Sequence, residues 1–175
     1  SPHLQFGAQS IANILRALSI GGISAQEAPY QAAILHLLRA IPKQAEYFTS
    51  QQIANVLNAL SKWLIPLQET PYREAIFHLL RVIPNKIARF NAQELANTLL
   101  SLSNWLILSK ESAYKEAFRD LVQAIPKQID SFSARNIADV LKAFSKSSIC
   151  PHTAPYQAII HALVKIIPRK ITLFN

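Results

Sequence analysis

The sequence has few residues of several types, and their scarcity excludes some classes of protein. Among its 175 residues there is one cysteine, Cys150, and no methionine. A single thiol excludes an internal disulfide framework and fits a reducing compartment, so we expect an intracellular location: a bacterial cytoplasm, an organelle or a host cell. No apolar run reaches the roughly 18 residues of a membrane span, and this segment contains no visible targeting signal. We therefore expect no membrane partner.

Residues that carry out catalysis are equally scarce. The three glycines exclude a Gly-rich phosphate loop. His36 and His78 occupy the same place in successive repeats, so they should lie about 10 Å apart at helix-packing distance. That is too far to share a metal ion, whose ligands lie about 2 Å away. The sequence therefore predicts no catalytic residues, no metal and no cofactor, and a protein that is not an enzyme.

The chain is rich in internal repetition. Phe6, Phe48, Phe90 and Phe132 follow one another at a spacing of 42 residues without any insertion. Such a fixed period is typical of stacked helical repeats. We expect one array over residues 1–175, with repeats at 6–47, 48–89, 90–131 and 132–173. A fifth repeat should start at Phe174, because the chain is expected to be a segment of a longer protein.

Each repeat reads as a helical hairpin, with positions counted from its Phe as zero. The first helix should cover positions 1–14, and capping boxes are expected at Thr49 with Gln52 and at Asn91 with Glu94. The second should cover positions 23–34, with caps at Thr70 and Ser112, and end at an Ile-Pro pair. Small residues at positions 6 and 11 flank the first helix, so identical helices can lie close in a row. The predicted fold is all-α: an α-solenoid of four stacked hairpins.

Polar residues at positions 3, 7, 10 and 14 form a stripe opposite the apolar face of each first helix. They are Gln9, Asn13, Arg16, Gln51, Asn55, Asn58, Lys62, Gln93, Asn97, Asn104, Arg135, Asp139, Lys142 and Lys146. A near-constant Asn with changing neighbours suits a repeating ligand such as single-stranded RNA. The alternative is an Asn ladder that only joins neighbouring helices.

Positive charge also recurs with the period. The net charge is +8, and positions 33–41 of the repeats supply nearly all of it. The candidate phosphate-contacting residues in this window are Lys43, Lys86, Arg89, Lys127, Arg169 and Lys170. The window predicts a basic stripe that tracks phosphates, or cations that complement the C-terminal ends of the second helices.

Two other recurring residues have predicted structural roles. Ser at position 13 is expected to bond the carbonyl four residues back. Trp63 and Trp105 precede apolar loops, and they are expected to close a hydrophobic edge between hairpins rather than to stack on a base.

The stretch "FNAQELANTLLSLSNW", followed by "SAYKEAFRDLVQAIP", resembles the octotricopeptide repeat. The strongest elements are Phe90, Gln93, Glu94, Leu95, Ala96, Asn97 and Leu99. The Pro-rich motif of that family is reduced here to "TPY" or "APY". The resemblance implies an α-solenoid that binds RNA and acts in RNA stability, processing or translation.

We therefore expect a monomeric RNA-binding helical-repeat segment that recognises single-stranded RNA in post-transcriptional regulation. Two alternatives remain open at this level. One is an armadillo-like solenoid whose Asn residues hold an extended or acidic peptide, which the scarcity of aromatic residues along the polar stripe favours. The other is an architectural array that serves a domain outside this segment.

Overall fold

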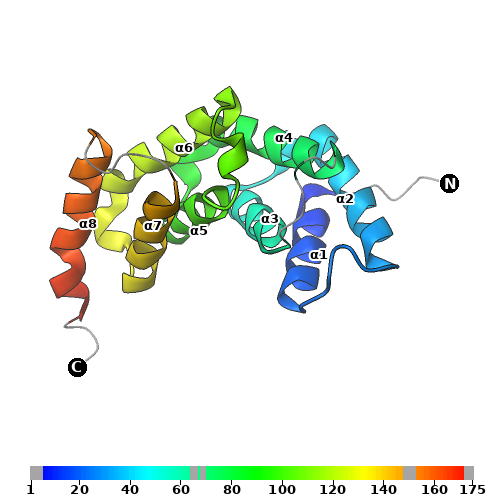
Figure 1. Ribbon diagram of the computed structural model, residues 1–175, viewed down its shortest axis with the longest axis horizontal. Coiled ribbons are helices and arrows are strands. Elements are labelled where there is room, and N and C mark those ends of the chain that lie inside the picture. Colours follow the sequence, from blue (N-terminus) through cyan, green and yellow to red (C-terminus); the bar gives the residue numbers. More distant parts are fainter. Residues whose placement is uncertain (1–5, 64–66, 68–69, 148–152, 172–175) are drawn as a thin grey trace. The chain divides into compact units, whose positions relative to one another are not determined.

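The computed structural model describes residues 6–63, 67, 70–147 and 153–171, and within these ranges the chain is helical and contains no strand (Figure 1). The predicted all-α class is therefore confirmed. The expected fifth repeat at Phe174, the loop residues 64–66 and Cys150 lie outside the described residues. The chain divides into two compact units, Ser1–Lys86 and Ile87–Asn175.

The first unit contains two hairpins. Its elements are α1 (Ala8–Ile20), α2 (Tyr30–Gln44), the short 3-10 turn η1 (Ala45–Tyr47), α3 (Ser50–Lys62) and α4 (Thr70–Lys86). The first helices α1 and α3 pack side by side, and so do the second helices α2 and α4. Each helix thus contacts its equivalent in the neighbouring hairpin, which is the packing expected of a helical repeat.

The second unit keeps the row of first helices, but its last helix packs differently from α4. It contains η2 (Ile87–Arg89), α5 (Ala92–Leu102), η3 (Leu106–Leu108), α6 (Ser112–Ala124), η4 (Ile125–Ser131), α7 (Ala134–Lys146) and α8 (Tyr156–Ile171). The first helices α5 and α7 pack closely, α6 packs on α5, and α8 packs on α7 and η4 rather than closely on the second helix α6.

The core consists of the predicted apolar faces. On α3, Ile53, Val56, Leu57 and Leu60 are all buried. The Phe that opens each repeat is buried at Phe48, Phe90 and Phe132, whereas Phe6 is 45% exposed. At roughly 25 cal/mol per Å² of apolar surface removed from water, these faces supply the main stabilisation of each hairpin.

Local capping fixes where the first helices begin. Thr49 accepts from the amide of Gln52, and the Gln52 side chain accepts from the amide of Thr49, so the predicted capping box is present. Asn91 and Glu94 form the second predicted box. Ser133 forms a third with Asn136. Gly7 precedes α1 without a side-chain cap.

The predicted ends of the second helices are wrong in three repeats. Helices α2, α4 and α8 continue through Pro42, Pro84 and Pro168 and end two or three residues later. Only in the third repeat does the helix end before proline, at Ala124. Proline removes one hydrogen bond, and near the end of a helix that loss is tolerated. The isoleucine before the proline is buried in the third repeat as well as in the first two, so its burial does not decide where the helix ends.

The predicted cap at Ser112 is also wrong. Ser112 is the first residue of α6, and its N-cap is Glu111, which makes no capping hydrogen bond through its side chain. Thr70 is likewise the first residue of α4. These starts depend on the preceding loops, whose sequences differ between repeats.

Candidate nucleic-acid interface

The capped first helices present their polar residues on the side away from the core. On α3, Gln51 and Lys62 are exposed, and Asn55 and Asn58 are half-buried. The same holds for the other ten residues of the polar stripe, since none of the fourteen is buried. The stripe is therefore accessible along each first helix.

The structure brings these residues together within each unit. In the first unit α1 packs on α3, which places Gln9 and Asn13 on the helix next to Gln51 and Asn55. In the second unit α5 packs on α7, which gives Gln93 and Asn97 as neighbours the helix of Arg135 and Asp139. Each unit thus carries two adjacent copies of the polar stripe.

The Asn side chains do not form a ladder between these helices. Asn13, Asn55 and Asn97 are all described, and their side-chain amides make no hydrogen bond to the described part of the protein. The hydrogen bond from the Ser101 hydroxyl to the main-chain carbonyl of Asn97, at 2.8 Å, does not involve the Asn97 side chain. The amides therefore keep both donor and acceptor groups for a ligand.

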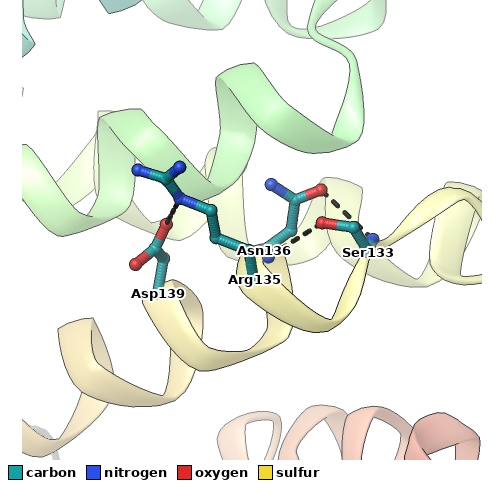
Figure 2. Close-up of polar contacts among 4 residues, drawn as sticks. All are labelled: Ser133, Arg135, Asn136 and Asp139. Atoms are coloured by element: carbon teal, nitrogen blue, oxygen red, sulfur yellow. Dashed lines mark hydrogen bonds and ion pairs between the residues drawn. The ribbon is translucent and has the colours of Figure 1, made fainter. Parts of the chain in front are cut away.

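The fourth repeat replaces the amide pair with a charged pair. On α7 the Nε atom of Arg135 lies 4.0 Å from Oδ2 of Asp139, one turn further along the helix (Figure 2). The Arg135 side chain is 90% exposed. Such an exposed pair contributes little to stability, so both groups remain available for contacts with a ligand. Figure 2 also shows the capping box of Ser133 and Asn136 at the start of the same helix.

At position 14, one hydrogen bond joins polar-stripe residues of two neighbouring first helices. The Nζ atom of Lys146 on α7 donates to Oδ1 of Asn104 at 2.9 Å, across one full repeat. The sequence alone gives the recurrence of polar residues at this position. It does not predict the bond, because the equivalent pair in the first unit is Ile20 and Lys62.

Two of the candidate phosphate contacts bind the protein itself. Lys86 donates through Nζ to the Glu46 carbonyl at 2.8 Å. Lys170 donates in the same way to the Asp130 carbonyl at 2.6 Å. Both carbonyls lie in the 3-10 turns η1 and η4, where the ends of helical turns carry partial negative charge. These lysines therefore help to join one hairpin to the next.

Glutamine takes the same position in the other two repeats. Gln44 donates through Nε2 to the Phe6 carbonyl at 2.6 Å. Gln128 donates to the Phe90 carbonyl at 2.7 Å. Position 38 thus alternates between Gln, which bonds its own repeat, and Lys, which bonds the preceding one.

The lysines at the neighbouring position 37 differ from those at position 38, because they bind no main-chain carbonyl in the described structure. Lys43 and Lys127 are exposed, and they make no hydrogen bond or ion pair within the described part of the chain. Both lie a few residues before the N-terminus of a first helix, α3 or α7. Arg89 and Arg169 are also exposed at the repeat junctions. The junctions therefore carry exposed positive charge.

The tryptophans are predicted to close the edge between hairpins. The indole Nε1 of Trp63 donates to the Ile23 carbonyl at 2.9 Å, across the two hairpins of the first unit. Trp105 is buried, with 5% of its surface exposed. The Trp63 bond joins the two hairpins as expected, and for Trp105 the structure shows burial alone.

The recurring serine bonds a different carbonyl from the predicted one. Ser61, Ser103 and Ser145 donate to the carbonyl three residues back, at 2.9, 2.7 and 2.9 Å. The predicted partner was the carbonyl four residues back. At the end of a helix the last turn tightens, which brings the third carbonyl within reach. Ser19 has a buried hydroxyl without a partner in the described structure.

An aromatic cluster in the second unit was missed by the sequence analysis. Tyr114 stacks on Phe118 at 5.8 Å, Phe118 contacts Phe144 at 6.4 Å, and Phe144 meets the edge of Tyr156 at 5.7 Å. A cavity of about 330 Å³ lies against Tyr114, Phe118 and Tyr156. The sequence features that could have predicted this cluster are the recurring Tyr at position 24 and the Phe residues at positions 28 and 12.

Burial raises the pKa of both tyrosines in this cluster. The pKa of Tyr114 is raised well above its usual value, first by burial and then by the nearby Tyr156. Burial also raises the pKa of Tyr156. The Tyr114 hydroxyl donates to the Leu102 carbonyl at 3.0 Å. This arrangement joins α6 to the end of α5 and has a structural role.

Metal-binding chemistry is not apparent in the described ranges. Among the residues that the structure describes, no three His, Cys, Asp or Glu side chains gather closely enough to hold an ion. His78 instead contacts its own helix, with Nδ1 2.8 Å from the Glu74 carbonyl. No described helix is long and apolar enough to cross a membrane.

Comparison with known families finds a match over part of each repeat. The sequence pattern of a family described as a protein of unknown function, DUF1601, matches residues 3–15, 24–57, 78–99 and 119–141, just over half of the chain. The chain belongs to the DUF1601 family. No curated protein and no solved structure matches it significantly.

The four matched segments end at the same repeat position, at Leu15, Leu57, Leu99 and Leu141. The DUF1601 pattern therefore contains positions 3 and 7 of every first helix, and three of the four repeat junctions. It leaves out positions 10 and 14, which are the two stripe positions that differ most between the repeats.

Proposed function

We propose that the four hairpins stack into one α-solenoid that binds single-stranded RNA along the polar stripe of its first helices. One observation carries this proposal. The amides of Asn13, Asn55 and Asn97 recur at one position, stay accessible and have no partner in the described protein. An amide offers a donor and an acceptor together, which suits the exposed edge of an unpaired base.

The positive charge of the junctions supports a phosphate-bearing ligand. Lys43 lies in the last turn of α2 and Lys127 in η4, seven residues before α3 and α7 begin, and both are exposed. With a net charge of +8, the protein attracts polyanions. Lys86 and Lys170 hold main-chain carbonyls, so they contribute charge more than direct contacts.

A peptide ligand is the second candidate. None of the fourteen stripe residues is aromatic, so bases could not stack there as they do in many RNA-binding proteins. The same Asn amides can pair with the backbone of an extended acidic peptide. In this case the junction cations would bind acidic side chains instead of phosphates.

Fluorescence anisotropy with short labelled RNA oligomers at several salt concentrations tests the proposal. If each repeat contacts one phosphate, about four counterions are released, which gives a slope of log affinity against log salt near −3. The double variant Lys43→Gln/Lys127→Gln should reduce the magnitude of this slope by roughly 1.4 and weaken all RNAs equally. The matched control is Lys110→Gln/Lys115→Gln, which removes the same charge from exposed positions outside the junctions.

Substitutions of the Asn side chains test contacts with the bases separately from electrostatic attraction of the phosphates. Asn55→Ala and Asn97→Ala should weaken RNA binding without changing the salt slope. Asn58→Ala and Lys142→Ala should alter the preference between RNA sequences, because these positions vary between repeats. Binding no stronger than that of an unrelated protein of equal charge would exclude RNA as the ligand. Asn-dependent binding of acidic peptides in its place would establish the second candidate.

A further inference from the structure

Asp139 is the only acidic residue among the fourteen residues of the polar stripe. It lies on α7 at position 7, where the other three repeats have Asn13, Asn55 and Asn97. Position 3 changes in the same repeat, from glutamine to Arg135. The fourth repeat therefore presents a carboxylate and a guanidinium where each other repeat presents two amides.

This charged pair contributes little to the stability of α7. The Nε atom of Arg135 lies 4.0 Å from Oδ2 of Asp139, which is too long for a hydrogen bond (Figure 2). The Arg135 side chain is 90% exposed, so water screens its attraction to Asp139. The Asp139 side chain is 21% exposed, and it accepts no hydrogen bond from the described part of the chain. Its carboxylate oxygens are therefore available to the donors of a ligand.

The charged pair differs from an amide pair in the hydrogen bonds that it can make. A carboxylate only accepts and a guanidinium only donates, whereas each amide does both. On the Watson–Crick edge of guanine, N1–H and the 2-amino group are neighbouring donors, and the acceptor O6 lies beside them. Adenine, cytosine and uracil have no two neighbouring donors on that edge. A carboxylate can therefore hold guanine, and no other base, by two parallel hydrogen bonds.

We propose that Asp139 and Arg135 make the fourth repeat specific for guanine, a specificity that rests on the proposed binding of single-stranded RNA. The Asp139 carboxylate accepts from N1–H and the 2-amino group, and the Arg135 guanidinium donates to O6. Arg135 also offsets the negative charge that Asp139 brings towards a phosphate-bearing strand. Because α7 packs on α5, the guanine should lie next to the base that Asn97 contacts.

Fluorescence anisotropy of the whole chain with short labelled oligo-U strands tests the guanine site. One central uracil is replaced by guanine, adenine, cytosine or inosine. The guanine strand should bind at least about fivefold more tightly than the adenine and cytosine strands, as expected for a bidentate contact between a side chain and a base. Inosine keeps N1–H and O6 but lacks the 2-amino group, so its strand should bind with an affinity between those of the guanine and adenine strands.

Asp139→Asn gives the fourth repeat the amide of the other three. The variant should still bind RNA but bind the guanine and adenine strands equally. It also removes one negative charge, and Glu116→Gln, at an exposed position of α6 outside the stripe, is the matched control. Glu116→Gln should tighten the binding of all strands equally and keep the preference for guanine.

The double variant Gln93→Arg/Asn97→Asp transfers the charged pair to α5, at positions that are exposed and half-buried. It should favour strands with two neighbouring guanines over strands with one, and it carries the test if Asp139→Asn folds poorly by circular dichroism.

The outcomes distinguish this site from the proposed function. RNA binding without a guanine preference, or a guanine preference that survives Asp139→Asn, would overturn the guanine site and leave RNA binding in place. Binding of every strand no stronger than that of an unrelated protein of equal charge would overturn both.

Discussion

Thr98 has a buried side-chain hydroxyl group that makes no hydrogen bond within the described ranges. It is fully buried on α5, and its Oγ1 atom has no hydrogen-bond partner in the described structure. The same position carries Val56 and Val140 in the second and fourth repeats, and both are buried. A buried hydroxyl without a partner costs free energy, and valine has nearly the same shape.

We expect Thr98→Val to raise the free energy of unfolding by about 1 kcal/mol, because it removes the unpaired hydroxyl and keeps the volume. Urea unfolding followed by circular dichroism measures the change. Val56→Thr is the matched control and should lower stability by roughly 1–3 kcal/mol, since it buries a new hydroxyl. A destabilised Thr98→Val protein would mean that the hydroxyl has an unseen partner.

Ala96 tests the close packing of neighbouring first helices. It is fully buried on α5, whereas Ala138 at the equivalent position of α7 is exposed. Ala96→Leu should lower stability by about 1–3 kcal/mol through overpacking. In dilute solution Ala138→Leu should change it by no more than about 0.5 kcal/mol. Equal effects of the two substitutions in thermal or urea melts would show that position 6 is not a close contact.

Tyr114 makes stability depend on alkaline pH. Its raised pKa means that the folded state keeps a proton that the unfolded state releases above pH about 10. The stabilisation is therefore complete below that pH and is lost as the pH rises further. Tyr114→Phe should cost about 1 kcal/mol near neutral pH through the lost bond to Leu102. Its deficit relative to wild type in urea melts should then narrow as the pH rises. A constant deficit would contradict this.

At the scale of the element, α1 is the one first helix without a side-chain cap. Gly7 has an extended backbone with φ −72°, and a Cβ atom built there meets nothing within 4 Å. Gly7→Ser should therefore raise stability by about 0.5–1 kcal/mol, by adding a cap and restricting the unfolded chain. The reverse change at an existing cap, Ser133→Gly, is the control and should lower stability in the same melts. No gain from Gly7→Ser would indicate that the start of α1 frays.

The same local chemistry explains which elements the sequence predicts well. The boxes of Thr49 and Asn91 are found as expected, because a capping box depends on only four consecutive residues. The helix ends at Pro42 and Pro84 were wrong, because a proline within the last turn of a helix removes only one hydrogen bond and is tolerated there. The aromatic cluster of Tyr114 was missed because it depends on a phenylalanine in the next repeat, Phe144, that the other repeats do not have.

At the scale of the whole molecule, the 42-residue period predicts which side of a helix is exposed better than it predicts individual side-chain hydrogen bonds. The accessible stripe and the buried flanks follow from counting positions, because equivalent residues of a repeat meet equivalent surroundings. The roles of Lys86 and Lys170 do not, because a lysine near a helix end can turn to a carbonyl or to solvent with little difference in energy. The structure is therefore needed to tell which lysines bind main-chain carbonyls and which face solvent. The accessible Asn amides, in contrast, can be identified from the sequence.

If the polar stripe binds RNA as proposed, the spacing of the first helices constrains the bound strand. Packed helices such as α1 and α3 lie about 8–10 Å apart, whereas stacked bases are about 3.4 Å apart. A strand that places one base on each repeat must therefore give up its own stacking. Adenine-rich strands stack strongly and uracil-rich strands hardly at all, so oligo-U should bind more tightly than oligo-A of equal length. Fluorescence of a 2-aminopurine placed within the strand should rise on binding, and unchanged fluorescence would mean that the bases remain stacked.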